Sequence, residues 1–128
     1  MSEKILVVED NEQNRVLMRQ ILTHHGYEVL EAADGLTGLA LARTHLPALI
    51  LLDIQMPVMD GFAVIRELRK PTGFLTGHAR KIKVIAVTSF AMKGDRERVL
   101  QAGFDEYVTK PIDTRKFPEL MKQVLAQG

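Results

Sequence analysis

Four short runs in the sequence, three of them apolar throughout, each end in polar residues that could take part in phosphate or metal chemistry. The residues that close these runs are, in chain order, Glu9 and Asp10, Asp53, Thr88 and Lys110. If the runs are parallel strands of one sheet, their carboxyl ends meet at a single edge, where such sheets bind ligands. One polar strand end would mean little, whereas four converging ends define a site.

The chemistry that these side chains could perform is phosphoryl transfer to an aspartate. Three carboxylates in a partly desolvated crevice repel one another, and a hard divalent cation relieves that repulsion. Mg²⁺ suits such a crevice because it keeps several of its own waters. The Lys110 ammonium and the Thr88 hydroxyl can hold a phosphoryl group, and Asp53 is then the carboxylate nucleophile.

The strands that must position this site are recognised by their composition. The runs from Ile5 to Val8, Leu49 to Leu52 and Val84 to Val87 are apolar at every position. Such runs are typical of strands buried on both faces of a parallel sheet. Two shorter strands are predicted within Tyr27 to Ala33 and Glu106 to Thr109.

Amphipathic segments between the strands predict helices. Their predicted positions are from a cap at Asn11 to Gly26, from Leu36 to near His45, from a cap at Asp60 to before Pro71, from Asp95 to Ala102, and from about Thr114 to Ala126. Alternating strands and helices with short connections predict an α/β fold. We expect a doubly wound, five-stranded parallel sheet of order 2-1-3-4-5 in a flavodoxin-like three-layer sandwich. Residues 71–81 are predicted to form a loop.

Composition limits the class of protein. The 128 residues are 46% hydrophobic and 26% charged, with a net charge of +1 and no cysteine. We therefore expect one soluble, cytoplasmic domain over residues 1–128, with no output domain. The balanced charge gives no basic field for nucleic acid, and the N-terminal apolar run is too short to insert into a membrane.

The whole chain resembles the CheY-like receiver domains of two-component response regulators. The matching motifs are the acidic pair after ILVV, the pattern D-x-x-M-P-x-M-D-G from Asp53 to Gly61, Thr88 after VIAV, and Lys110-Pro111. In this order the combination is highly specific. Residues 90–95 further resemble receivers of the cell-division-control type.

The resemblance implies a role for each of these residues. Asp53 would be the phospho-acceptor, and Asp10, Asp53 and the main-chain carbonyl of Gln55 would bind Mg²⁺ directly. Glu9 would act through a metal-bound water, and Lys110 would pair with the phosphoryl group. The peptide bond between Lys110 and Pro111 would be cis.

The resemblance also implies a switch and a pair of residues that tune the phosphoryl lifetime. The switch pair is Thr88 and Tyr107, although Tyr107 taken alone could equally be a half-buried core aromatic. The lifetime positions are Gln55 and Phe90, and we expect Phe90 to shield the phosphoryl group from water. Phe90 could instead pack on the following helix or face a partner. Ser89, where many receivers have alanine, is small enough to leave phosphate access open.

The implied function is that of a response regulator in two-component signalling. A histidine kinase or histidine phosphotransferase would donate the phosphoryl group. The signal would leave through a protein target that contacts residues 95–126, or the chain would act as a phosphorelay intermediate. The chain would be a monomer or weak dimer that catalyses its own phosphorylation and dephosphorylation without being a turnover enzyme.

Three other readings compete with this one. A phosphatase of the haloacid dehalogenase type needs an acid/base aspartate two positions after the nucleophile, where this chain has Gln55. A flavodoxin-like FMN carrier needs a phosphate-cradling loop after the first strand, where Glu9 and Asp10 would repel phosphate. A receiver fold used only for docking would not need the complete set of acceptor, acidic pair, threonine and lysine.

Overall fold

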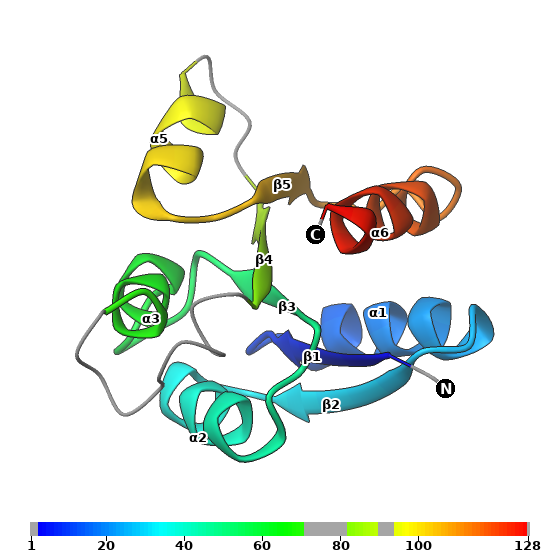
Figure 1. The fold of residues 1–128 in the computed structure, drawn as a ribbon, viewed down its shortest axis with the longest axis horizontal. Helices are drawn as coiled ribbons and strands as arrows, with labels where there is room; N and C mark the ends of the chain where they lie inside the picture. The colour runs from blue at the N-terminus through cyan, green and yellow to red at the C-terminus, as the bar shows by residue number, and fades with distance from the viewer. Residues whose placement is uncertain (1–2, 71–81, 90–93, 128) are drawn as a thin grey trace.

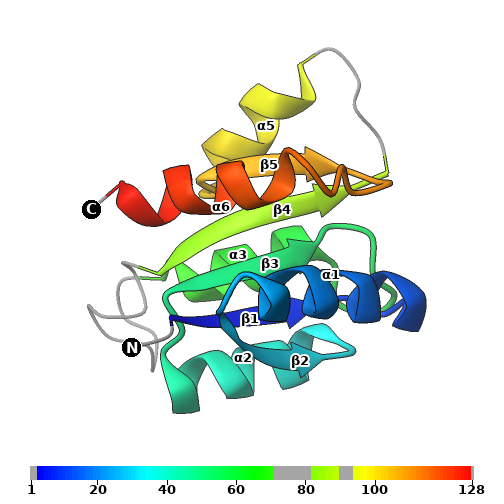
Figure 2. The same cartoon turned by 90° about the vertical axis from the view of Figure 1, so that its right-hand side faces the viewer.

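The computed structural model describes residues 3–70, 82–89 and 94–127. Within these residues, five strands form one parallel sheet in the order β2-β1-β3-β4-β5 (Figure 2). The strands are β1 (Lys4–Val8), β2 (Glu28–Ala32), β3 (Leu49–Asp53), β4 (Lys83–Thr88) and β5 (Glu106–Thr109). The predicted α/β fold and strand order are therefore confirmed. The predicted loop at 71–81 lies outside the described residues.

Five helices within the described residues cover the two faces of the sheet. They are α1 (Glu12–His24), α2 (Gly35–His45), α3 (Gly61–Leu68), α5 (Asp95–Ala102) and α6 (Phe117–Ala126). Helices α1 and α6 lie on one side of the sheet, and α3 and α5 lie on the other (Figure 1). None of these helices is long and apolar enough to cross a membrane.

The start of α6 differs from the prediction. The helix begins at Phe117, three residues after the predicted start at Thr114. The Asp113 carboxylate accepts hydrogen bonds from the main-chain N–H groups of Arg115 and Lys116. This side-chain turn competes with helical bonding and delays the regular helix.

Two apolar cores hold the three layers together, because alternate residues of each strand point to opposite faces. On one face, Leu6, Ile50 and Val84 pack against α2, α3 and α5. On the other face, Leu49, Leu51 and further strand residues pack against Met18 of α1 and Met121 of α6. The central strands are buried on both faces, which explains their continuous apolar sequence.

Side-chain caps begin the helices that follow the first three strands. Asn11, Asp34 and Asp60 each accept a hydrogen bond from the main-chain N–H three residues later, at 2.8 to 2.9 Å. These caps satisfy N–H groups that an α-helix leaves unpaired in its first turn. Each therefore fixes how the chain leaves the carboxyl edge of the sheet.

At the opposite, amino edge of the sheet, Arg69 ties α3 to the strands β4 and β5. Its guanidinium donates to the carbonyl oxygens of Ile82 and Gly103, at 2.8 and 3.1 Å. It also donates to the carboxylate of Asp105 at 3.1 Å. Asp105 in turn accepts a hydrogen bond from the main chain of Val84 at 2.8 Å. We call Arg69, Ile82, Gly103 and Asp105 the amino-edge clamp.

Candidate functional site

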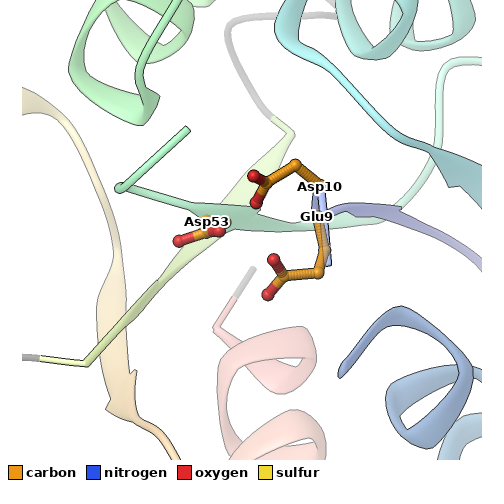
Figure 3. Close-up of side chains that lie close together, drawn as sticks. All are labelled: Glu9, Asp10 and Asp53. Carbon is orange, nitrogen blue, oxygen red and sulfur yellow. The ribbon is translucent and has the colours of Figure 1, made fainter. Parts of the chain in front are cut away.

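The polar strand ends predicted from the sequence meet at the carboxyl edge of the sheet. Glu9 and Asp10 follow β1, and Asp53 is the last residue of the neighbouring strand β3 (Figure 3). Glu9 and Asp53 are buried, whereas Asp10 is exposed. The three side chains each offer one carboxylate oxygen within 4.8 Å of the others. An acidic cluster thus lies between the interior and solvent.

The Lys110 ammonium, which follows β5, enters this cluster from the far side of β4. Its Nζ lies 2.8 Å from Oε1 of Glu9 and 3.3 Å from Oδ2 of Asp53. Apart from these ion pairs, neither oxygen accepts a hydrogen bond of normal geometry from the described residues. Among the described residues, the Lys110 ammonium therefore pairs with two buried carboxylates and Asp10 lies beside them, so that negative charge is in excess.

These residues fit a hard divalent cation. Carboxylate oxygens are the ligands that Mg²⁺ prefers, and two buried ones, Oε1 of Glu9 and Oδ2 of Asp53, lack hydrogen bonds of normal geometry within the described chain. The exposure of Asp10 leaves room on the solvent side for the waters that Mg²⁺ retains. The donor set is therefore suited to Mg²⁺ rather than to a metal that prefers sulfur or imidazole.

The electrostatics of the cluster appear in two shifted pKa values. Burial, followed by the neighbouring Glu9 carboxyl, raises the pKa of Asp53 to about 7 against an ordinary value of 3.8, although the Gln55 N–H and Lys110 oppose this rise. Burial by itself would lower the pKa of Lys110, but the carboxylates of Glu9 and Asp53 raise it above its ordinary value. The lysine therefore stays charged, and a cation near Asp53 would favour the carboxylate form.

Main-chain geometry holds the Asp53 side chain in place. Its Oδ1 accepts a hydrogen bond from the main-chain N–H of Gln55 at 3.0 Å. The chain then folds back so closely that a Cβ on Gly61 would lie 2.7 Å from the carbonyl oxygen of Asp53. Only glycine fits there, which gives the Asp-Gly at the end of the sequence motif a steric reason.

The acidic pair after β1 is fixed in a similar way. Oε2 of Glu9 accepts the main-chain N–H of Asn11 at 3.1 Å, and the carbonyl of Glu9 accepts the Arg15 guanidinium at 2.8 Å. The N–H of Glu9 donates to Ala32 of β2 at 3.0 Å. Asp10 is held between these fixed groups, with its side chain toward solvent and toward the cluster (Figure 3).

The remaining predicted site residues lie along β4 and β5. Thr88 ends β4 and is 5% exposed, and its carbonyl accepts the N–H of Lys110 at 2.8 Å. Tyr107 is half-buried beside Ala86, where it packs against the core beneath α3 and α5. The peptide bond between Lys110 and Pro111 is cis, as the resemblance implied. Phe90 lies outside the described residues.

One contact at the site was not anticipated from the sequence. The side-chain oxygen of Gln55 accepts a hydrogen bond from the main-chain N–H of Ser89 at 3.0 Å. From its type and position alone, Ser89 is predicted only to be small enough to leave phosphate access open. The register of β3 on β4, with Asp53 opposite Val87, is what brings these two positions together, and no local pattern reveals it.

Comparison of the sequence with known families and proteins agrees with this arrangement. The profile of the response regulator receiver domain matches residues 5–122. The polar-differentiation response regulator DivK of Brucella ovis is 44% identical over 128 residues, which cover 100% of both chains.

Similar folds are found among solved structures. The receiver domain of a sensor histidine kinase from Pseudomonas aeruginosa has a TM-score of 0.86 at 32% identity, over 99% of this chain and 100% of that one. That receiver was crystallised with a magnesium ion coordinated in its active-site cleft. The chemotaxis protein CheY4 of Vibrio cholerae also has a TM-score of 0.86, at 25% identity over 97% of this chain and 99% of that one.

Proposed function

The chain belongs to the response regulator receiver family, and from that premise we propose that Asp53 is its phospho-acceptor. As a receiver it takes up a phosphoryl group in two-component signalling and is not a turnover enzyme. The observation that carries the assignment is the buried Asp53 carboxylate, which lies 3.3 Å from the Lys110 ammonium and within reach of two further carboxylates.

The residues proposed to hold Mg²⁺ are Asp10, Asp53 and the main-chain carbonyl of Gln55, with Glu9 acting through a bound water. The oxygen ligands of the acidic cluster and the magnesium-bound relative support this assignment. When bound, the ion offsets negative charge on the carboxylates and on the incoming phosphoryl group.

The reaction follows from these positions. An oxygen of ionised Asp53 attacks phosphorus, and the bond from phosphorus to the donor atom breaks as the acyl phosphate forms. The Lys110 ammonium is placed to pair with a phosphoryl oxygen because it already lies beside Asp53. The hydroxyl of Thr88 supplies a further hydrogen bond at the same edge.

A histidine kinase is the partner that the receiver family implies. Beyond that, we propose that a phosphorylation-dependent protein target contacts residues 95–126, and that Thr88 and Tyr107 form the switch. A groove of about 450 Å³ supports this surface, since it is lined by residues of β5, α6 and the turn between them, including Tyr107 and Phe117. Transfer to a histidine phosphotransferase in a phosphorelay remains an alternative route for the signal.

The other parts of the proposal rest on the resemblance alone. They are a receiver domain over residues 1–128, a cytoplasmic location, a monomeric or weakly dimeric state, and no role for nucleic acid. A role in polar differentiation is proposed by analogy with DivK. The tuning of phosphoryl lifetime by Gln55 and Phe90 also stays a prediction.

The acceptor assignment is tested by covalent labelling. The wild-type chain, incubated with acetyl phosphate and Mg²⁺, should gain one phosphoryl group by mass spectrometry, and Asp53→Asn should gain none. Asp34→Asn is the matched control, because asparagine also caps the helix that Asp34 begins. Full labelling of Asp53→Asn would refute the assignment of the acceptor.

The proposed switch surface needs a separate test. Hydrogen exchange, measured with and without beryllofluoride in the presence of Mg²⁺, should change most within residues 95–126. Changes confined to α1 and α2 would contradict the proposed output surface.

A further inference from the structure

The loops that follow β3 and β4 are joined by the side chain of Gln55. Its oxygen accepts the main-chain N–H of Ser89 at 3.0 Å, while its own main-chain N–H donates to Asp53 at 3.0 Å. Gln55 is half-buried and Ser89 is exposed. One residue thus contacts the acceptor carboxylate through its backbone and the neighbouring loop through its side chain.

This contact takes the place of a missing sheet hydrogen bond. Strands β3 and β4 are parallel, and the N–H of Ile54 donates to the carbonyl of Val87 at 3.0 Å. In a regular parallel ladder the next bond would run from the N–H of Ser89 to the carbonyl of Ile54. That carbonyl instead accepts the N–H of Gly61 at 2.9 Å, because the chain has already turned away. The side-chain oxygen of Gln55 accepts the hydrogen bond that the N–H of Ser89 does not make to Ile54.

The main-chain N–H of Ser89 could also donate a hydrogen bond to a phosphoryl group on Asp53. A phosphoryl group on Asp53 brings three oxygens that need hydrogen-bond donors or cations. Near Asp53, the N–H of Ile54 is used within the sheet and that of Gln55 by the Asp53 carboxylate. Within the described residues, the N–H of Ser89 donates to a side chain, which can rotate away without disturbing the sheet.

We propose that Gln55 is a positioning residue that competes with the phosphoryl group for the N–H of Ser89. In the unphosphorylated chain, the Gln55 side chain fastens the start of the loop after β4 to the loop after β3. Phosphorylation of Asp53 displaces this side chain, and the N–H of Ser89 then donates to a phosphoryl oxygen instead. The inference rests on the proposed function, since it takes Asp53 as the phospho-acceptor.

Substitution of the Gln55 side chain separates this role from metal binding. The proposed Mg²⁺ ligand at this position is the main-chain carbonyl, which every substitution retains. Gln55→Leu removes the hydrogen-bond acceptor at similar size, and Gln55→Ala removes the whole amide. Gln20→Leu, on the exposed face of α1, is the matched control.

The experiment measures three quantities on each full-length variant. They are amide hydrogen exchange at Ser89 without ligands, the concentration of beryllofluoride that half-saturates the chain in excess Mg²⁺, and the Mg²⁺ concentration that half-saturates it alone. Loss of one ordinary hydrogen bond should speed Ser89 exchange by about tenfold in both Gln55 variants. Beryllofluoride should half-saturate them at a concentration about threefold or more lower, by the same argument. The Mg²⁺ measurement separates an effect on the metal from an effect on the N–H of Ser89, and Gln20→Leu should behave as the wild type in all three measurements.

Each other outcome contradicts the hydrogen bond, the competition for the N–H of Ser89, or the proposed function. Unchanged Ser89 exchange in both variants would show that the hydrogen bond does not hold the loop. Faster exchange with unchanged or weaker beryllofluoride binding would overturn the competition and leave a purely structural contact. Failure of the wild-type chain to bind beryllofluoride would refute the proposed function itself, and the wild-type measurement alone identifies that case.

Discussion

Two clusters of charged side chains lie at opposite edges of one sheet and differ in how completely their charges are paired. In the amino-edge clamp, the Arg69 guanidinium meets one carboxylate and two carbonyl oxygens. At the carboxyl edge, the single ammonium of Lys110 faces the buried carboxylates of Glu9 and Asp53, with Asp10 beside them. Both clusters are partly or fully buried, so burial alone does not distinguish them.

The difference separates a structural role from a functional one. Buried polar groups usually find partners because an unpaired group costs free energy of folding. The amino-edge clamp meets that requirement and joins α3 to the strands. The carboxyl edge does not meet it, and burial together with the Glu9 carboxyl raises the pKa of Asp53 above its ordinary value. We therefore expect substitutions in the amino-edge clamp to lower the stability of the fold. Substitutions at the carboxyl edge should raise stability and abolish function.

The largest expected effect comes from breaking the amino-edge clamp. Arg69→Met should lower the free energy of unfolding by about 2–4 kcal/mol, because the carboxylate of Asp105 and two carbonyl oxygens lose the guanidinium as a donor. The side chain is 22% exposed, so we place the effect below that of a fully buried pair. Urea denaturation measures it. Arg66→Met, at an exposed position of α3, the helix that Arg69 follows, should change stability by no more than about 0.5 kcal/mol.

At the carboxyl edge the expected change has the opposite sign. The pKa of Asp53 is about 7 in the folded chain and 3.8 ordinarily, so the folded chain binds more protons between these values. The free energy of unfolding therefore falls as pH rises from about 4 to about 7, and stays low above that. Without Mg²⁺ at pH 8, Asp53→Asn should be more stable than the wild type by about 1–3 kcal/mol.

Urea unfolding at pH 5 and pH 8 with EDTA tests this sign. The advantage of Asp53→Asn should be clearly larger at pH 8 than at pH 5. A variant less stable than the wild type at pH 8 would mean that the buried carboxylate of Asp53 contributes net stability.

Binding of Mg²⁺ should relieve the same imbalance. At a Mg²⁺ concentration 100-fold above the dissociation constant, the wild type should gain about 2.7 kcal/mol. If Asp10→Asn weakens binding about tenfold, it should lose about 1.4 kcal/mol of that gain at the same concentration. Thermal unfolding with and without Mg²⁺ provides the measurement, and Glu12→Gln in the first turn of α1 is the control. An equal gain for Asp10→Asn would remove Asp10 from the proposed ligands.

The smallest effect should come from an ion pair that is not buried. Lys70 pairs with Glu67 at 2.7 Å, but the two side chains are 49% and 35% exposed. Lys70→Met should therefore change the free energy of unfolding by less than about 0.5 kcal/mol. Because Lys70 adjoins Arg69, this result would show that the clamp depends on burial and geometry rather than on positive charge at the end of α3.

Much of the carboxyl edge could be predicted because the sequence marks where each strand ends. Runs such as that from Ile5 to Val8 are apolar throughout, since both faces of the sheet are covered, and the next residue falls at the edge. Parallel order then brings Glu9 and Asp53 together without knowledge of any individual contact.

The contacts that escaped prediction depend on long-range register. Arg69 finds its partners at Gly103 and Asp105 only because α3 ends beside the turn before β5. Gln55 reaches Ser89 because β3 turns away one residue before β4 does. In both cases the residue types are ordinary, and the geometry that selects them exists only in the folded chain.

The order of the strands also determines when the reactive centre comes into being during protein synthesis. Glu9 follows the first strand to leave the ribosome, whereas Lys110 follows the last one. A chain whose synthesis or proteolysis stops before β5 would carry the carboxylates without the ammonium that lies between them. We therefore expect competence to receive a phosphoryl group to depend on completion of the sheet, because a chain that lacks β5 also lacks Lys110.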